Sequence, residues 1–302
     1  MRILYLLLAA LFYSTHAHAD DLETIAVNFE HKNKVYHYTS TKFPFGYYFN
    51  SSALHHVSMA TLDWPPYIGE GLCDRGWVFQ LGVALLLSRG YGVKVSFFPW
   101  ARAVKEVENG NVDILFPEYY IEPDAPSDIH KGKKRLDNLA LSRPFPGGEI
   151  AFLQRAGEVI NFRGDLKSLV GETIGVVRGY QNTPEFDRMM DAGHFTIMHA
   201  VNDLQLAKLL FAKRVNLIIG DPRVLNHTVR HSDLPNTKIR AMLDVMQQVT
   251  PALEYKYLYF AISKHREHWQ SLIERLNLAL VEFNRSGELK RIVEEKNGSC
   301  MP

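Results

Sequence analysis

The sequence reads Gly110-Asn-Val-Asp-Ile-Leu-Phe-Pro-Glu-Tyr-Tyr120 and, after a polar loop, Arg135-Leu-Asp-Asn-Leu-Ala-Leu-Ser-Arg-Pro-Phe145. The first part opens with a turn and continues with the short apolar run 112–116, which predicts a buried β-strand. Polar and aromatic side chains follow this strand at once, at Glu118, Tyr119 and Tyr120. Because ligands of open α/β sheets bind beyond the carboxyl ends of the strands, these residues are candidates for a binding site.

The same alternation of strands and helices extends to both sides of this stretch. Strands are predicted at residues 57–62, 93–98, 149–154, 172–177, 215–220 and 255–262. Helices are predicted at residues 77–88, 99–107, 202–213, 267–284 and 287–295. A further helix is predicted to start at Thr183-Pro184-Glu185, which combines an N-cap, a first-turn proline and an acid. This order predicts an α/β architecture with mainly parallel sheets, flanking helices and right-handed crossovers.

Two interruptions divide the pattern into units. Pro146-Gly147-Gly148 ends the first unit, a second α/β unit follows, and the chain returns to the first near Tyr255. The predicted parts are lobe 1 at residues 57–146 and 254–302, lobe 2 at residues 147–253, and an N-terminal extension at residues 20–56 that packs on lobe 1. One lobe inserted into another is joined to it by two crossing strands, so we expect a hinged clamshell that closes around a ligand.

The first 19 residues have the composition of a secretory signal peptide. Arg2 precedes an apolar run at residues 3–12, and Ala17-His18-Ala19 is a suitable cleavage site. The apolar run is too short to cross a bilayer, and no later segment has 18 uninterrupted apolar residues. We therefore expect a soluble protein that is exported.

Composition and charge exclude several classes of function. The chain of 302 residues has 34 basic and 33 acidic residues, or 33 of each once Arg2 is removed with the signal peptide. This balance argues against a nucleic-acid partner and against an anionic membrane surface, so we expect a small-molecule ligand. A monomer is also expected. Thirteen histidines are present, but no metal-binding spacing and no nucleotide motif accompanies them, so neither a metal nor a cofactor is expected.

The two cysteines, Cys73 and Cys300, fit an oxidising compartment. A disulfide between them would close a loop of more than 200 residues. In the chain-entropy model such a loop stabilises the fold by roughly 5 kcal/mol, less any strain. The alternative is two free thiols.

Arg135 lies seven residues before Ser142 and nine before Pro144. This spacing resembles the first-lobe ligand loop of bacterial periplasmic solute-binding proteins of the polar amino-acid type, extracellular solute-binding protein family 3. The resemblance covers about residues 57–296 and implies a two-lobed type II periplasmic-binding-protein fold. It also implies that Arg135 grips a ligand carboxylate with its planar fork of donors. The alternative is a solvated arginine, because lysines are nearby and the loop is longer than in the family.

Two further places correspond to ligand contacts in that family. Gly179-Tyr180-Gln181 stands where the family has Gly-Thr-Thr, before a helix start, where backbone N–H groups attract anions. Asp221 stands where the family has an acid that binds the ligand's ammonium group, although it is equally suited to cap a helix at Pro222. A buried Glu118 would favour a cationic ligand, or would pair with a neighbouring arginine.

Aromatic side chains at the predicted strand ends complete the candidate site. Trp64, Tyr67 and Trp100 would form a wall on which a ligand stacks, and Tyr120 belongs to the same set. The alternative for each of them is ordinary packing in the core or at its rim.

The leading hypothesis is a periplasmic binding protein for a small zwitterion. Arg135 and the loop at Gly179 would hold its carboxylate, and Asp221, with Glu118, would hold its amino group. The closed form would be recognised by a membrane ABC permease or by the periplasmic domain of a signalling receptor. The alternative is an enzyme of the same fold, similar to cyclic-acid dehydratases, in which Glu118 and Asp221 carry out acid–base catalysis. A structural cell-envelope protein is a third class, which does not explain polar residues at successive strand ends.

Overall fold

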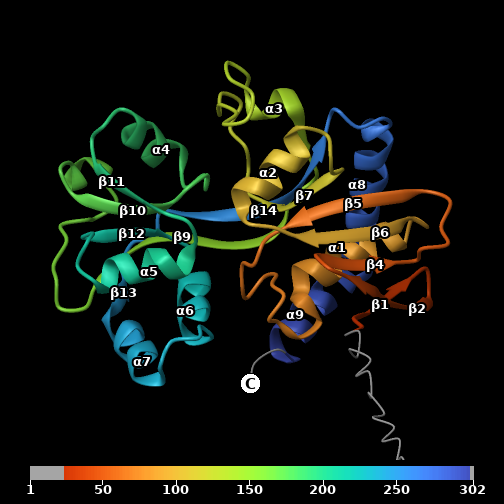
Figure 1. The fold of residues 1–302 in the computed structure, drawn as a ribbon, viewed down its shortest axis with the longest axis horizontal. Coiled ribbons are helices and arrows are strands. Elements are labelled where there is room, and N and C mark those ends of the chain that lie inside the picture. The colour runs from red at the N-terminus through yellow and green to blue at the C-terminus, as the bar shows by residue number, and fades with distance from the viewer. Residues whose placement is uncertain (1–23, 300–302) are drawn as a thin grey trace, which may run out of the picture.

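A computed structural model describes residues 24–299, with side chains to residue 294. The predicted signal peptide at residues 1–19 and Cys300 lie outside the described residues, so the cleavage and the Cys73–Cys300 disulfide remain predictions. Figure 1 shows two lobes, joined by the long strands β9 (Phe145–Arg155) and β14 (Glu254–Ser263).

Lobe 1 is built on one sheet with the strand order β14-β7-β5-β6-β4-β3. Its parallel centre consists of β5 (His56–Thr61), β6 (Gly92–Phe97) and β7 (Ile114–Glu118). The strands β3 (Thr41–Phe43), β4 (Gly46–Phe49), β8 (Leu139–Leu141) and β14 pair antiparallel at its sides. Every residue of β7 is buried, as expected for an apolar strand inside a parallel sheet.

Helices cover both faces of this sheet. They are α1 (Trp77–Leu87), α2 (Trp100–Glu108), α8 (Trp269–Ser286) and α9 (Glu288–Ser299), with the short turns η1 (Cys73–Arg75) and α3 (Arg135–Asn138). Every residue of α1 is buried, because this helix lies between the sheet and the helices α8 and α9. Gly82 allows the close approach, since a Cβ there would lie 3.0 Å from the ring of Phe116 and 3.1 Å from that of Phe260.

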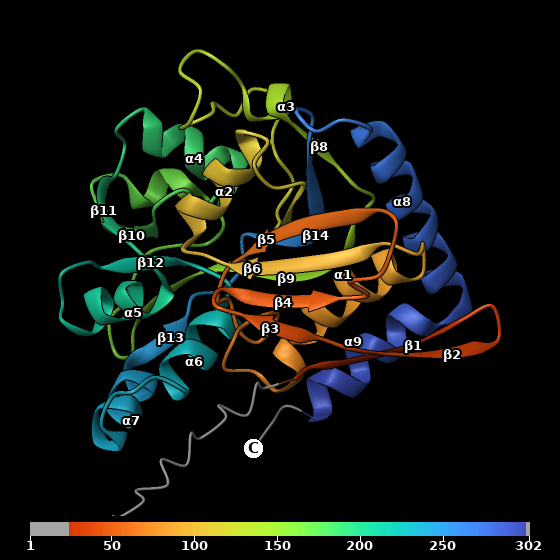
Figure 2. The ribbon, with the colours of Figure 1, turned by 45° about the vertical axis from the view of Figure 1, so that its right-hand side comes forward.

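The segment before residue 57 is attached to lobe 1 in two ways. Strand β4 pairs with β6 and so extends the sheet. The ribbon of β1 (Ala26–His31) and β2 (Lys34–Thr39) lies beside α8 and α9 (Figure 2). The buried Phe29 ring lies 5.8 Å from that of Phe283 in α8, and the Glu30 N–H donates to Glu288 at 3.0 Å.

Lobe 2 has the strand order β11-β10-β12-β9, with β13 (Met246–Gln248) also paired to β9. Its parallel strands are β10 (Thr173–Val177), β11 (Thr196–Ala200) and β12 (Leu217–Gly220). Its helices are α4 (Pro184–Asp191), α5 (Asp203–Phe211), α6 (Pro222–Arg230) and α7 (Asn236–Val245), and η2 (Leu166–Leu169) is a short turn. The side chains of Thr183, Asn202 and Asp221 cap α4, α5 and α6.

The hinge corrects one expectation. Pro146-Gly147-Gly148 was expected to break the pattern before a strand at 149, but these residues belong to β9, which starts at Phe145. The glycines are needed inside the strand. A Cβ on Gly147 would overlap the carbonyl oxygen of Lys256 on β14, and one on Gly148 would overlap the side chains of Asp221 and Tyr67.

The predicted α/β class with two lobes and two hinge crossings is confirmed. The exact lobe boundaries remain predictions. Strand β11 and helix α7 were not predicted, because each has only one buried residue and lacks a clear apolar period. Within the described residues, no helix is both long enough and apolar enough to cross a membrane.

Candidate functional site

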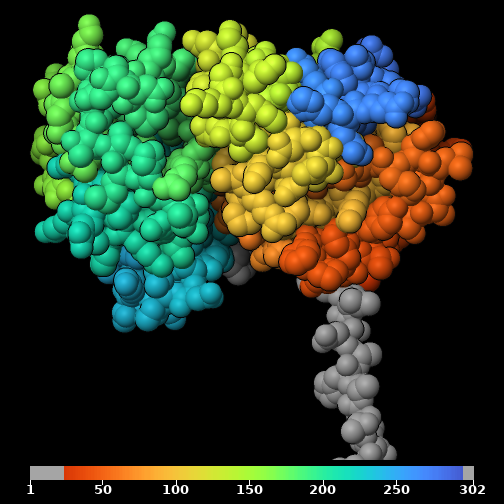
Figure 3. Space-filling view, turned by 45° about the horizontal axis from the view of Figure 1, so that its top comes forward, coloured from red at the N-terminus to blue at the C-terminus, as the bar shows by residue number. Residues whose placement is uncertain are grey.

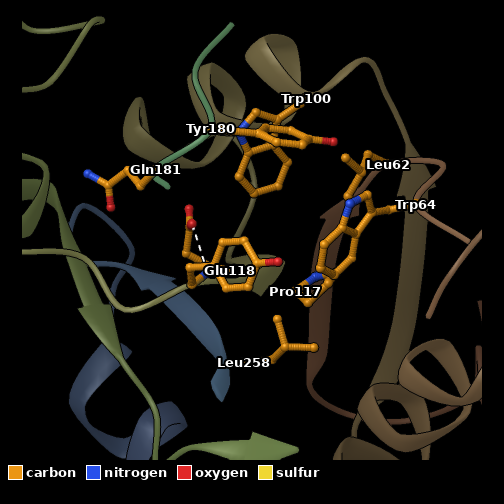
Figure 4. A pocket seen from close by; sticks show the side chains of 9 residues that line it. Leu62, Trp64, Trp100, Pro117, Glu118, Tyr180, Gln181 and Leu258 are labelled. Atoms are coloured by element: carbon orange, nitrogen blue, oxygen red, sulfur yellow. Dashed lines mark hydrogen bonds between the residues drawn. The ribbon is translucent and has the colours of Figure 1, made fainter. Parts of the chain in front are cut away.

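A small cavity lies between the two lobes at the carboxyl ends of their central strands. Lobe 1 contributes residues that follow β5, start α2, end β7 and lie on β14, and lobe 2 contributes the loop after β10. The lining residues are Leu62, Trp64, Trp100, Pro117, Glu118, Tyr119, Tyr180, Gln181 and Leu258. Figure 4 shows the rings of Trp64, Trp100 and Tyr180 around one side of this space, with Glu118 and Gln181 across from them.

The lobes are closed on each other around this cavity, and their surfaces meet along a seam in Figure 3. The indole Nε1 of Trp100 in lobe 1 donates to the carbonyl oxygen of Gly179 in lobe 2 at 3.2 Å. The centres of water molecules can occupy only about 20 Å³ of the cavity. One buried water needs about 10–15 Å³ by this measure, so an amino acid fits only after the lobes or their side chains move.

Aromatic rings form most of the walls. Trp64 stacks on Tyr67 with ring centres 4.5 Å apart, and its edge meets Tyr119 at 5.6 Å. Trp100 meets Tyr180 edge-on at 6.3 Å. Tyr67 therefore supports the wall from behind and does not line the cavity itself. Such rings offer both stacking surfaces and faces that attract cations.

Buried carboxyl groups stand around these rings. The Tyr180 hydroxyl donates to Asp203 at 3.0 Å. Burial raises the pKa of Asp203 to about 6, against the opposing effect of the Tyr180 bond. Burial also raises the pKa of the Tyr119 and Tyr180 hydroxyls, so both remain protonated at neutral pH and can donate hydrogen bonds.

Arg135 has other partners than the predicted ligand carboxylate. Its guanidinium is buried, with Nη2 2.7 Å from Glu118 Oε2 and Nε 3.1 Å from Glu108 Oε1. Burial disfavours its charge, but the two glutamates outweigh burial and raise the pKa of Arg135. Arg135 is not among the lining residues of the cavity, and its donors are already bonded to carboxylates of the chain.

Asp221 combines two roles in this closed form. Its Oδ1 accepts from the backbone N–H of Arg223 at 2.8 Å, which makes it the N-cap of α6. Its Oδ2 accepts from the hydroxyl of Tyr67 in lobe 1 at 2.6 Å. Arg223 also donates to the Tyr67 hydroxyl and, at 2.8 Å, to the carbonyl oxygen of Gly147. The carboxylate that was predicted to bind a ligand's ammonium group thus contacts the opposite lobe.

Of the remaining predicted residues, some line the cavity and others do not. Tyr180 and Gln181 line the cavity, whereas Gly179 adopts a positive φ of 80° and contacts Trp100. The Asn182 N–H, at the predicted anion site, already donates to Asp187 at 3.0 Å. Tyr120 is 46 % exposed and packs on Tyr259 outside the cavity.

A larger cleft of about 1290 Å³ adjoins the cavity and shares Leu62, Trp100 and Tyr180 with it. Acidic and histidine side chains line it, among them Asp63, Glu70, Asp203, His227 and His231. Within the part of the chain that the structure describes, no group of three or more His, Cys, Asp or Glu is placed to hold a metal ion.

Sequence reasoning missed Lys256, which lies on β14 two residues before the lining residue Leu258. Its side chain is buried, and its Nζ lies 5.0 Å from the ring centre of Tyr119 and 3.5 Å from the carbonyl oxygen of Gln181. The alternation of residues 254–258 contains the signal, because Lys256 and Leu258 are buried and the residues beside them, Tyr255 and Tyr257, are exposed.

Among known proteins, only solved structures are similar to this chain in the comparisons made of sequence and of fold. No protein-family model matches the sequence, and no curated protein matches it. A histidine kinase sensor domain with similarity to periplasmic binding proteins matches with a TM-score of 0.63 and 15% identity, over 80% of this chain and 96% of that one. An ancestral arginine-binding protein bound to arginine matches with 0.62 and 18%, over 80% and 97%. The GluR0 ligand-binding core from Nostoc punctiforme with L-glutamate matches with 0.59 and 14%, over 79% and 98%.

The similarity extends over most of each chain. The protein therefore has the two-lobed periplasmic-binding-protein fold that the sequence predicted.

Proposed function

We propose that this chain is a solute-binding protein of the amino-acid type, family 3, which captures a small amino-acid-like ligand between its lobes. One observation carries the proposal: a small cavity between the lobes whose aromatic and polar walls come from both of them. A ligand that contacts both lobes only in the closed form stabilises that form by differential affinity.

The walls favour a ligand with an amino group. Trp64, Trp100 and Tyr180 offer ring faces or edges, and Glu118 contributes negative charge at the end of β7. Asp203 lies just behind Tyr180 and adds to the same potential when it is ionised. A cation that enters this space gains cation–π attraction in a poorly hydrated environment, and the attraction of Asp203 when that group is ionised, whereas Glu118 is already paired with Arg135.

The proposed location is the periplasm, and the proposed partner is an ABC permease or a membrane sensor. Both kinds of partner have support among proteins of similar structure, which include an amino-acid ABC transporter substrate-binding protein and a histidine kinase sensor domain. The seam between the lobes would present a composite surface only when the lobes are closed.

The geometry favours binding without catalysis. A general acid–base pair needs carboxyl groups that can reach a substrate, but Glu118 is bonded to Arg135 and Asp221 to Tyr67. The structures of similar fold named above are binding proteins and sensors, which supports the same view.

The proposal is tested by a thermal-shift screen of the mature protein with the L-amino acids, polyamines, dipeptides and dicarboxylates. A bound ligand raises the melting temperature by mass action. At a hundredfold excess over Kd it adds about 2.7 kcal/mol to the free energy of unfolding. The variant Trp100→Ala should lose the response, because it removes a cavity wall and an interlobe hydrogen bond. Trp269→Ala, on α8 away from the cavity, is the matched control and should keep it. Equal responses of both variants, or none from the native protein, would contradict the proposal.

A further inference from the structure

Lys256 is the buried cation of the hinge. It lies on β14 between the exposed Tyr255 and Tyr257, and only 6 % of the residue is exposed. The Nζ donates one long hydrogen bond of 3.5 Å to the Gln181 carbonyl oxygen in lobe 2. On its other side it lies 5.0 Å above the ring of Tyr119. Both neighbours line the cavity between the lobes, so the ammonium group lies directly behind lining residues, although Lys256 is not itself one of them.

This ammonium group has no carboxylate partner within salt-bridge distance among the described side chains. Arg135, which is buried to the same degree, has two. A buried charge is costly unless an opposite charge or a full set of hydrogen bonds compensates it. Burial lowers the pKa of Lys256 in spite of the more distant Glu254, Asp187, Glu118 and Glu122. The closed form therefore leaves a cation uncompensated at this place.

Two more polar groups around the same cavity are unsatisfied. The Tyr119 hydroxyl and the Gln181 side-chain carbonyl oxygen are buried and have no hydrogen-bond partner within residues 24–294. Buried polar groups are nearly always bonded in folded proteins, so such groups demand an explanation. An ammonium group and a hydroxyl that can donate, beside an oxygen that can only accept, are complementary to an anion that carries an N–H group.

We propose that Lys256 is the anion-binding residue of the interlobe cleft and takes the role that Arg135 was expected to have. The ligand's carboxylate pairs with Lys256 and accepts from the Tyr119 hydroxyl, and its amino group donates to the side chain of Gln181. This assignment rests on the proposed function and narrows it to ligands that carry a carboxylate next to an N–H group. Lys256 lies on a hinge strand and Gln181 in lobe 2, so such a ligand also links the two lobes.

The experiment compares matched ligands and matched variants by isothermal titration calorimetry. The ligands are the L-amino acid with the largest thermal shift and its decarboxylated amine, for example L-arginine and agmatine. The variants are Lys256→Met and Lys264→Met. Lys264 follows the same strand, but its Nζ donates to Leu136 at 2.6 Å and lies over Trp269, away from the cavity.

We expect the amino acid to bind the native protein at least tenfold more tightly than its amine. Lys256→Met should lose this preference and at least tenfold in affinity for the amino acid, whereas Lys264→Met should keep both. Lys256→Arg, which retains the charge, should preserve part of the preference. Circular dichroism shows whether each variant is folded, and Lys256→Gln replaces Lys256→Met if that variant is not.

Three results would overturn the assignment. If Lys256→Met binds the amino acid as tightly as the native protein does, Lys256 is not part of the binding site. Equal affinity of the native protein for acid and amine would leave the solute-binding function intact but exclude a carboxylate anchor. Absence of binding by every compound of the screen would refute the proposed function and this inference together.

Discussion

Arg135 and Lys256 are both buried cations beside the same cleft, yet their surroundings are opposite. Arg135 is held by two glutamates at 2.7 and 3.1 Å, and Glu108 also accepts from Asn138 at 3.3 Å. Lys256 has one long bond to a carbonyl oxygen. The first cation is compensated inside the chain and stabilises lobe 1. The second remains a positive charge without a counter-ion beside the cleft, and the carboxylate of a ligand can pair with it.

The largest effect is expected from Arg135→Met. It leaves Glu108 and Glu118 buried without their counter-ion, so the free energy of unfolding should fall by about 3–5 kcal/mol. Urea unfolding followed by circular dichroism measures this change. Arg102→Met is the control, because Arg102 is mostly exposed and its contact with Glu106 is 3.7 Å long. A loss below about 1 kcal/mol for Arg135→Met would show that the guanidinium is not a structural counter-ion.

Asp203 is a buried carboxyl group that forms no ion pair with the described side chains, so it extends the comparison to an uncompensated acid. Its folded pKa is about 6, above the ordinary value of 3.8, so the unfolded chain releases its proton first. Asp203 therefore lowers the free energy of unfolding progressively as the pH rises from about 4 to 6. Asp203→Asn should remove this loss, worth up to about 3 kcal/mol for a shift of two units, and raise stability at pH 8.

Melting temperatures between pH 4 and 8 check this expectation. The exposed Asp244→Asn serves as the control and should leave the pH dependence of the native protein unchanged. Asp187 is half-buried, and desolvation raises its pKa to about 6, so part of the slope should remain in Asp203→Asn and disappear in the double variant. An unchanged slope in the double variant would contradict the assigned pKa shifts.

The smallest effect is expected from Lys256→Met without ligand. Removal of an uncompensated buried charge should leave the unliganded protein as stable as before or more stable by about 1 kcal/mol. Urea unfolding beside Arg135→Met gives the sign directly. A loss above about 2 kcal/mol would mean that Lys256 is compensated inside the chain, as Arg135 is.

Most of the fold was predictable because it depends on local patterns. The strand at 112–116, the helix start at Thr183-Pro184 and the return near Tyr255 are each visible in a short window of sequence. The hinge was harder, since Gly147 and Gly148 are usually signs of a turn. Their place inside β9 follows from the close approach of Lys256, Asp221 and Tyr67, which no local pattern shows.

The site was predictable in its residue types but not in its pairings. Trp64, Trp100, Glu118, Tyr180 and Gln181 line the cavity, as strand-end reasoning suggested. The fate of Arg135 depended on Glu108, which lies 27 residues away on another helix. The hydrogen bond between Tyr67 and Asp221 spans 154 residues and both lobes. Such contacts arise only from the folded chain.

The most direct test of the whole account is a crystal structure of the complex with the tightest-binding amino acid. The account predicts that the ligand's carboxylate lies within hydrogen-bond distance of Lys256 Nζ, while Arg135 keeps both glutamates. A carboxylate bound to Arg135, with Lys256 turned away from the ligand, would contradict it.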